Sequence, residues 1–242
     1  MTAATATAAT ATAATASGAA GTRLHTEAAP GVWVTVEPVG TPADDPAGLT
    51  PHDLADAEHL PEWRARELLA ARRALRRLLA AHFPQARHAP VTYTDRGAPR
   101  LVDQPRIGIS VSHDGGAVAA CAALDHAVGV DLQHPPDTVS DGMLRRCAKT
   151  HTEQLARLPM AARTREFAWL WTVREALVKA DGTGLAGGLW TADVAPRSRH
   201  GASGRHRWVS LREQSPIPLS CAYTPLSEPT PPTERPLEND SE

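Results

Sequence analysis

Residues 169–185 read WLWTVREALVKADGTGL, and this stretch decides how the rest of the sequence is interpreted. It predicts the end of a helix that begins near Thr164 and stops at Gly182, because polar side chains favour the first turn of a helix and glycine favours the position after the last. Glu175 and Lys179 are four residues apart, so they share one face of this helix. Alone, such a pair is an ordinary salt bridge that stabilises a helix by roughly 0.2–0.5 kcal/mol.

The chain before this helix predicts strands, a helix and a hairpin. Residues 31–38 alternate apolar and polar side chains and predict a strand, whereas leucines at helical spacing predict a helix over residues 55–82, broken near Pro61. Residues 107–124 predict a hairpin, because two apolar runs flank HDGG, whose glycines accept positive φ. The stretch VGVDLQHPP, residues 128–136, predicts another strand, which its two prolines end.

After the helix, apolar runs predict strands over residues 190–196, 207–213 and 218–224. The order of strand, helix and strands occurs twice along the chain. We therefore expect an α+β fold of two similar lobes, each a helix with short antiparallel strands, over residues 29–125 and 126–225.

Both ends of the chain have compositions that predict disorder. Residues 1–28 are mostly Ala and Thr, and residues 226–242 are rich in Pro and acids, so neither end can bury enough apolar area to fold. The N-terminal run lacks the basic start and bulky apolar core of a signal peptide, and it is too weakly apolar to span a membrane. We expect no membrane association.

Cysteine and lysine usage narrows the interpretation further. The spacing of Cys121, Cys147 and Cys221 fits neither a zinc site nor a disulfide framework, and two of them lie inside apolar runs, as core residues do. Without a targeting segment, we expect a reducing cytoplasm. The sequence has only two lysines, Lys149 and Lys179, among 25 basic side chains, so the lysine on the quoted helix calls for an explanation.

Five residues on separate predicted elements could form one site. Asp131 lies on a strand and Glu175 on a helix, and two such carboxylates can share a hard cation such as Mg²⁺, which completes its shell with waters and substrate phosphates. Lys179 lies one helical turn beyond Glu175, where its compact ammonium suits a phosphate. Ser112 and His113, beside the hairpin glycines, offer donors to a second phosphate oxygen.

These motifs together resemble the signature pair of the phosphopantetheinyl transferases, in the larger type that activates surfactin synthetase. The first motif of that family is G-[VI]-D-[IVL]-E, and GVDLQ stands here at residues 129–133. The second is W-x-x-[KR]-E-A-x-x-K followed by G-x-G-L, which residues 171–185 match. An SHDGG hairpin at residues 112–116 and a Gly-Ala-Pro turn at 97–99 add to a resemblance that covers about residues 63–223. The pair of motifs is specific, whereas either one alone would be weak.

The resemblance implies a fold of two lobes related by a pseudo-two-fold, in a single chain that we expect to be a monomer. It implies transfer of phosphopantetheine from coenzyme A to a serine of an apo acyl or peptidyl carrier protein, with Mg²⁺ or Mn²⁺ as cofactor and release of adenosine 3′,5′-bisphosphate. Carrier proteins of polyketide, peptide or fatty acid synthesis all remain open.

The resemblance also assigns roles by position. Asp131 and Glu175 match the metal ligands, and Gln133 falls where the family often has a third acid. Lys179 matches the lysine that contacts the coenzyme A pyrophosphate. The other matched positions contact coenzyme A: His113 and Ser112 its phosphates, Arg73 and Arg66 its nucleotide end, and Gly97 its adenine.

Two residues depart from the family pattern. Gln133 removes a negative charge beside the metal and should weaken its binding, although the amide can still coordinate through its carbonyl or a water. Ala98 stands where a lysine is common, and Arg96 or Arg100 could replace it.

A base must take the proton of the serine hydroxyl. Glu175 is the first candidate, directly or through a metal-bound water, and Glu153 is the second. Glu153 could equally be a helix first-turn acid that the helix dipole favours.

Two alternative functions stay open. A degenerate family member would bind coenzyme A but transfer poorly because of Gln133. A nucleic-acid-binding module could use the arginine-rich helix, but that helix lacks interleaved aromatic residues and the chain has a net charge of -2. We therefore expect no nucleic acid partner.

Overall fold

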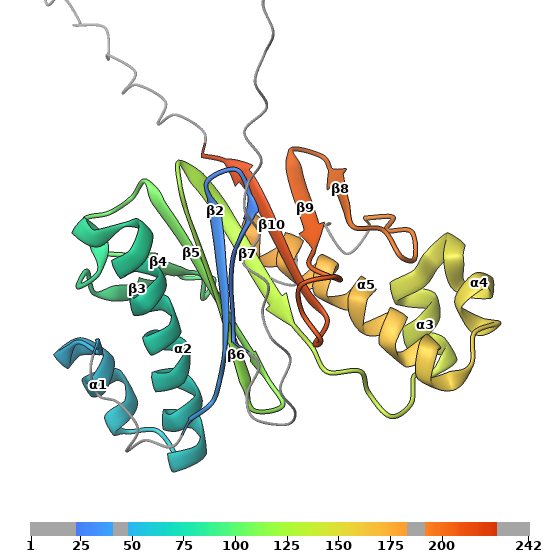
Figure 1. The fold of residues 1–242 in the computed structure, drawn as a ribbon, viewed down its shortest axis with the longest axis horizontal. Helices are drawn as coiled ribbons and strands as arrows, with labels where there is room; N and C mark the ends of the chain where they lie inside the picture. Colours follow the sequence, from blue (N-terminus) through green and yellow to red (C-terminus); the bar gives the residue numbers. More distant parts are fainter. Residues whose placement is uncertain (1–22, 41–47, 183–191, 227–242) are drawn as a thin grey trace, which may run out of the picture.

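The computed structural model describes residues 23–40, 48–182 and 192–226, and it is an α+β fold with helices outside two antiparallel sheets (Figure 1). The chain up to the second lobe contains β1 Leu24–Ala29, β2 Val32–Pro38, α1 Pro51–Glu58, α2 Glu62–His82, η1 Pro84–Ala86, β3 Val91–Tyr93, β4 Pro99–Leu101, β5 Ile107–Asp114 and β6 Ala117–Leu124. The remainder contains β7 His126–Leu132, α3 Asp141–Ala148, η2 Lys149–His151, α4 Thr152–Ala156, α5 Met160–Asp181, β8 His200–Ser203, β9 His206–Ser210 and β10 Leu219–Pro225.

Two four-stranded sheets form the middle of the molecule. Their strand orders are β1-β2-β6-β5 and β7-β10-β9-β8, and β3 pairs with β4 in a separate two-stranded sheet. The chain crosses from the first large sheet to the second at Asp125, between β6 and β7. The division into two lobes at residues 125 and 126 remains a prediction. The pseudo-two-fold relation of the lobes remains a prediction.

Three apolar clusters join the layers in the order α2, first sheet, second sheet, α5 (Figure 1). β6 shows how the sequence builds them, because its side chains are small and apolar and it is buried on both faces. Ala120 and Ala122 pack in the cluster with α2, whereas Ala119 and Cys121 pack in the cluster between the sheets. Cys121 Sγ lies 3.5 Å from Cys221 Sγ across the sheets, and both thiols are free and buried, as expected for core cysteines.

Both long helices begin directly after a proline, Pro61 for α2 and Pro159 for α5. The helix that we predicted to begin near Thr164 therefore begins earlier, at Met160, because proline suits a helix start and cannot continue a helix from within. Its predicted end is confirmed, since Gly182 caps it in the left-handed conformation at φ 68°. No helix in the described ranges is both long and apolar enough to cross a membrane.

Two expectations about strands need correction. Residues 24–28 belong to β1 and not to a tail, because this segment pairs with β2 from Leu24 opposite Val36 onward. The strand predicted over residues 190–196 is absent from its described part, 192–196, where Ala192 and Val194 instead pack from an irregular segment into the α5 cluster. The rest of that prediction, and the predicted tails at residues 1–22 and 227–242, lie outside the described residues.

Candidate active site

Asp131 and Lys179 meet at the place where β7, β5 and α5 come together. Lys179 Nζ lies 2.7 Å from Asp131 Oδ1 and donates to the Val130 carbonyl oxygen at 3.0 Å. The Ser112 hydroxyl donates to the same Asp131 oxygen at 2.8 Å and accepts a hydrogen bond from the Leu132 backbone at 3.4 Å. Asp131 is only 6% exposed, so this carboxylate is held by two side chains and screened from water.

Two glycines allow these elements to approach so closely. A Cβ atom on Gly129 in β7 would lie 2.0 Å from the Ala176 carbonyl oxygen of α5. A Cβ atom on Gly108 in β5 would lie 2.0 Å from the His126 carbonyl oxygen of β7. The glycine of the GVDLQ motif therefore has a structural reason, because any side chain there would push the strand that carries Asp131 away from the helix.

The charges at this place disfavour two ionised carboxylates. Burial raises the pKa of Asp131, although Lys179 and Ser112 act in the opposite direction. Burial also raises the pKa of Glu175, and the negative charge of Asp131 raises it further, against an opposing effect of Lys179. Glu175 and Asp131 are therefore close enough to repel each other, and a cation placed near both would relieve that repulsion.

The end of the β5–β6 hairpin lies beside the end of β7. His113 is half-exposed, and its Nδ1 atom lies 3.7 Å from Glu67 Oε2 of α2. Gln133 donates from Nε2 to Asp114 Oδ2 at 3.2 Å. Sequence reasoning missed Asp114, whose one signal is that it stands between His113 and the turn glycines of the SHDGG hairpin.

A cavity of about 840 Å³ opens beside Lys179 and Glu175. Its walls come from the β3–β4 hairpin, the first half of β5, the start of β7 and the last turns of α5. Gly97, at φ 80°, lines it within the predicted Gly-Ala-Pro turn, together with Ala98 and both arginines proposed to replace the missing lysine, Arg96 and Arg100.

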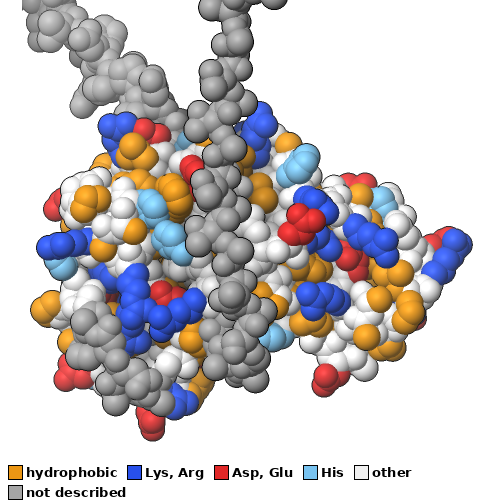
Figure 2. Space-filling view, in the orientation of Figure 1, with side chains coloured by type: hydrophobic (Ala, Val, Ile, Leu, Met, Phe, Trp, Pro, Cys, Tyr) orange, Lys and Arg blue, Asp and Glu red, His pale blue; other side chains and the backbone are white. Residues whose placement is uncertain are grey.

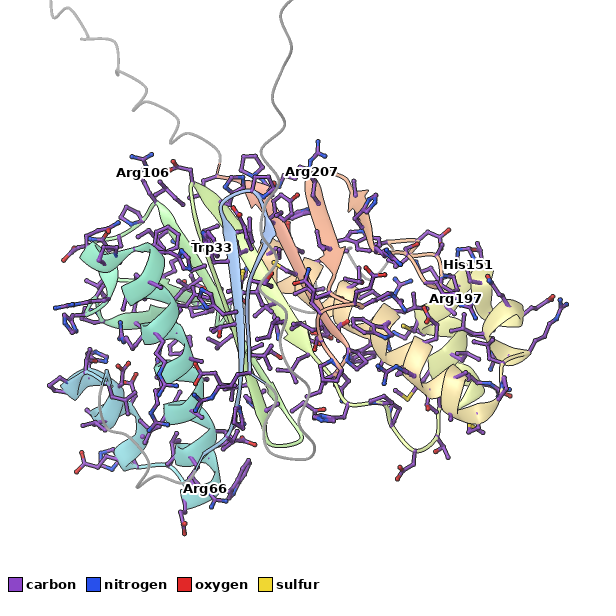
Figure 3. The ribbon with its side chains drawn as sticks, in the orientation of Figure 1. Trp33, Arg66, Arg106, His151, Arg197 and Arg207 are labelled. Atoms are coloured by element: carbon purple, nitrogen blue, oxygen red, sulfur yellow. The ribbon has the colours of Figure 1, made fainter. Side chains whose placement is uncertain are left out.

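Three predicted site residues, Arg73, Arg66 and Glu153, are not among the residues that line this cavity. Arg73 on α2 is half-buried, and Arg66 is exposed at the lower end of α2 (Figure 3). Glu153 is exposed in the first turn of α4, 3.6 Å from Arg157. The position of Glu153 in the first turn of α4 also fits the helix-dipole interpretation, and its role as a base remains a prediction.

Sequence reasoning also missed that part of the arginine helix is buried. Figure 2 shows basic side chains, in blue, gathered over α2, whose sequence contains arginines and no lysine. Arg76, however, is 2% exposed and binds both oxygens of the fully buried Asp53 at 2.9 Å. Arg72 is also buried and donates to the Tyr93 hydroxyl at 3.1 Å, and Tyr93 lines the cavity. These arginines hold α1 and the β3–β4 hairpin in place and do not face solvent.

The donors at the centre of the site suit a hard cation. Within the described ranges, no group of three or more His, Cys, Asp or Glu residues is arranged to hold a metal ion. Asp131 and Glu175 would provide two carboxylates and Gln133 an amide oxygen, an all-oxygen set of the kind that Mg²⁺ takes besides waters and phosphates. The Lys179 ammonium on Asp131 shows that this carboxylate already accommodates a cationic group.

Comparisons with known proteins show which proteins this chain resembles. Residues 127–224 match the sequence model of the 4′-phosphopantetheinyl transferase superfamily. Over 128 residues, the chain is 37% identical to a Synechocystis sp. protein that carries a provisional 4′-phosphopantetheinyl transferase name, covering 50% of this chain and 51% of that protein. It is 34% identical over 109 residues to the L-aminoadipate-semialdehyde dehydrogenase-phosphopantetheinyl transferase of Eremothecium gossypii, covering 42% of this chain and 40% of that protein.

The matched segment contains both motifs, at residues 129–133 and 171–185, and it includes Asp131, Glu175 and Lys179. The similarity to the phosphopantetheinyl transferase superfamily thus covers residues 127–224, and both relatives carry phosphopantetheinyl transferase names. The chain spans about half the length of the first curated relative and two fifths of the second.

Proposed function

We propose that this chain is a phosphopantetheinyl transferase of the larger, surfactin-synthetase-activating type. It transfers phosphopantetheine from coenzyme A to a serine hydroxyl of an apo acyl or peptidyl carrier protein and releases adenosine 3′,5′-bisphosphate. The observation that carries this proposal is the meeting of Asp131, Glu175 and Lys179 beside a cavity, within the segment that matches the superfamily.

The cavity supports coenzyme A as the donor substrate. Its volume of about 840 Å³ is within the range of small-molecule sites. The backbone of the turn at Gly97 would receive the adenine, and Arg96 and Arg100 would contribute positive charge in place of the lysine that Ala98 lacks. Lys179, at the other wall, would bind the pyrophosphate once it leaves Asp131 for the more strongly charged phosphates.

Asp131 and Glu175, with Gln133, would hold Mg²⁺ or Mn²⁺. When bound, the ion supplies charge neutralisation on the pyrophosphate and on the leaving group. The chain's own residues supply the positioning: Lys179 and His113 orient the phosphates, and bringing the serine hydroxyl into line provides much of the rate acceleration.

Glu175 is the best-placed base for the serine proton. It borders the cavity, and the raised pKa of its carboxyl makes it a better proton acceptor than an ordinary surface glutamate. We expect Glu175→Gln to retain the fold and the melting temperature but to lose turnover by at least about 100-fold, as measured by single-turnover transfer. A Glu175→Gln variant with wild-type turnover would rule out this role.

One alternative remains supported by a specific observation. Gln133 and Ala98 both remove charge from the site, so a member that binds coenzyme A but transfers slowly is the second candidate. The nucleic-acid alternative is weakened, because Arg72 and Arg76 are engaged in buried contacts with Asp53, Asp56 and Tyr93.

We further propose that the enzyme works in the cytoplasm as a monomer.

Intact-mass spectrometry tests the proposal. An apo carrier protein is incubated with the full chain, coenzyme A and Mg²⁺, with an EDTA control. A phosphopantetheine mass gain that EDTA abolishes supports both the transferase and its metal. No gain on acyl and peptidyl carriers, with coenzyme A still raising the melting temperature of the chain, would favour the slow or degenerate member. RNA binding without any thermal shift by coenzyme A would overturn the proposal.

A further inference from the structure

The neighbours of the Gln133 side chain show which way its amide group is oriented. Its Nε2 atom lies 3.2 Å from Asp114 Oδ2 and 3.4 Å from the His134 carbonyl oxygen. A carboxylate and a carbonyl are both acceptors, so the amide must present its NH₂ group to them. The carbonyl oxygen Oε1 is then the end that faces away, and no residue in the described part of the chain donates a hydrogen bond to it.

Asp114, which sets this orientation, is itself held in place. Its Oδ2 atom accepts from the His134 backbone nitrogen at 2.6 Å and lies 3.0 Å from His134 Nδ1. The His134 ring covers the hairpin turn, where a Cβ atom on Gly115 would come within 2.4 Å of Nδ1. The Asp114 carboxylate therefore ties the β5–β6 turn to the end of β7, and its orientation is not that of a free surface side chain.

Asp114 also acts on the site through its charge. Gln133 follows Asp131 by two residues, so both side chains leave the same face of the β7 segment. The Asp114 carboxylate lies against Gln133 and the His134 backbone and so brings a negative charge to the end of β7. The negative charge that the family motif places at position 133 is thus present here at position 114, on the neighbouring hairpin.

We propose that Asp114 and Gln133 form an exchanged acid–amide pair that completes the cation site. Asp114 is the positioning residue: it holds the Gln133 amide so that its carbonyl oxygen, and not its NH₂ group, is available to a divalent cation bound by Asp131 and Glu175. This inference rests on the proposed function. Gln133 departs from the family motif but still supplies an oxygen ligand, so the third ligand of the cation is kept.

The pairing of Asp114 with Gln133 predicts that Glu at position 133, the residue of the family motif, would not improve the site. Glu at position 133 would place a second carboxylate at hydrogen-bond distance from Asp114, with no donor between them, and the like charges would repel. Gln133→Glu alone should therefore weaken the site. The double variant Asp114→Asn/Gln133→Glu rebuilds the hydrogen bond with the roles exchanged, because the Asn amide can donate to the new carboxylate.

Mn²⁺ binding to the full chain in the presence of coenzyme A, followed by the electron paramagnetic resonance signal of free Mn²⁺, tests the pair. Partners that orient metal ligands typically contribute 10–100-fold to affinity, so Asp114→Asn and Gln133→Glu should each weaken Mn²⁺ binding about tenfold. The double variant should return to within about threefold of the wild type, the non-additivity that contacting residues show. The matched control Asp137→Asn removes an exposed carboxylate nearby and should bind as the wild type does.

The outcomes separate this inference from the proposed function. Wild-type Mn²⁺ affinity in Asp114→Asn, or additive losses in the double variant, would overturn the pair and leave the transferase standing. A wild-type chain that binds no Mn²⁺ with coenzyme A present would overturn both. Melting curves establish that each variant is folded. If Asp114→Asn does not fold, Gln133→Leu carries the test, because it removes Oε1 and keeps Asp114; unchanged Mn²⁺ affinity in that variant would overturn the inference.

Discussion

Replacing Gly129 with alanine should push β7 away from α5 and so disturb the candidate site between them. A Cβ atom there would lie 2.0 Å from the Ala176 carbonyl oxygen and 2.6 Å from the Ala180 backbone nitrogen. These are backbone atoms of a packed helix, which cannot rotate away. The strand and helix must therefore separate by about 1.4 Å before the closest contact reaches an ordinary 3.4 Å.

The magnitude follows from the two consequences of that separation. An added methyl in a packed core destabilises a protein by about 1–3 kcal/mol. At about 2–4 °C per kcal/mol for a chain of this size, the melting temperature should fall by about 2–12 °C. Because β7 carries Asp131 and α5 carries Glu175 and Lys179, a displacement of about 1 Å should also lower the transfer rate about 100-fold.

Scanning calorimetry and single-turnover transfer to an apo carrier protein measure the two effects on Gly129→Ala. Gly142→Ala is the matched control, because Gly142 is exposed within α3 and an added Cβ atom meets nothing within 4 Å. That control should gain up to about 1 kcal/mol in the free energy of unfolding, since alanine is the better helix former. A Gly129→Ala variant with both the melting temperature and the transfer rate of the wild type would refute the role of this close approach.

Three further predictions concern the buried groups away from the cavity. Asp53→Asn should lower the free energy of unfolding by about 3–5 kcal/mol in urea titrations, because it leaves the buried Arg76 without its ionic partner; a loss below about 1 kcal/mol would contradict the pair. Burial acts to raise the pKa of Asp53, but hydrogen bonds, led by that from Arg76, outweigh burial and hold the pKa below 3.8. The stabilisation by the ionised Asp53 is therefore present at neutral pH and is lost only as the pH falls through that lowered pKa. Acid titration should therefore give a steeper loss of stability in the wild type than in Asp53→Asn, and parallel curves would contradict the linkage. Burial raises the pKa of the Cys147 thiol to about 11 and that of Cys121 well above its usual range, so Ellman's reagent should label these thiols, and Cys221, only after unfolding; rapid labelling of the folded chain would show that they are reachable.

Local sequence patterns predicted most of the elements around the site. The HDGG turn placed the β5–β6 hairpin, since both turn glycines have positive φ, and leucine spacing placed α2. The start of α5 was set too late, because the polar residue Thr164 was preferred as a start over Pro159, which lies earlier. Residues 24–28 of β1 were assigned to the tail because they follow a long Ala- and Thr-rich run that dominates the local composition.

In the candidate site, too, some contacts were predicted from the sequence and others were missed. The pair Asp131 and Lys179 was predicted to share a site from two motifs about fifty residues apart, and their atoms lie 2.7 Å apart. Asp114 was missed, because its contact with Gln133 depends on how the end of β5 lies against the end of β7. The burial of Arg76 was missed as well, because its partner Asp53 is on another helix and a helical pattern alone suggests a solvated face.

The sequence by itself determined which groups stand in the candidate site: two carboxylates, one lysine, and the glycines that let a strand and a helix approach each other. These are properties of side chains and of backbone freedom, which a single residue carries wherever it lies. Only the tertiary structure decided which charges face one another. Three contacts follow from the packing of separate elements: the ion pair of Lys179 with Asp131, the ion pair of Arg76 with Asp53, and the hydrogen bond from Gln133 to Asp114. Electrostatic and hydrogen-bond energies depend on distances between atoms, which a local sequence pattern does not give.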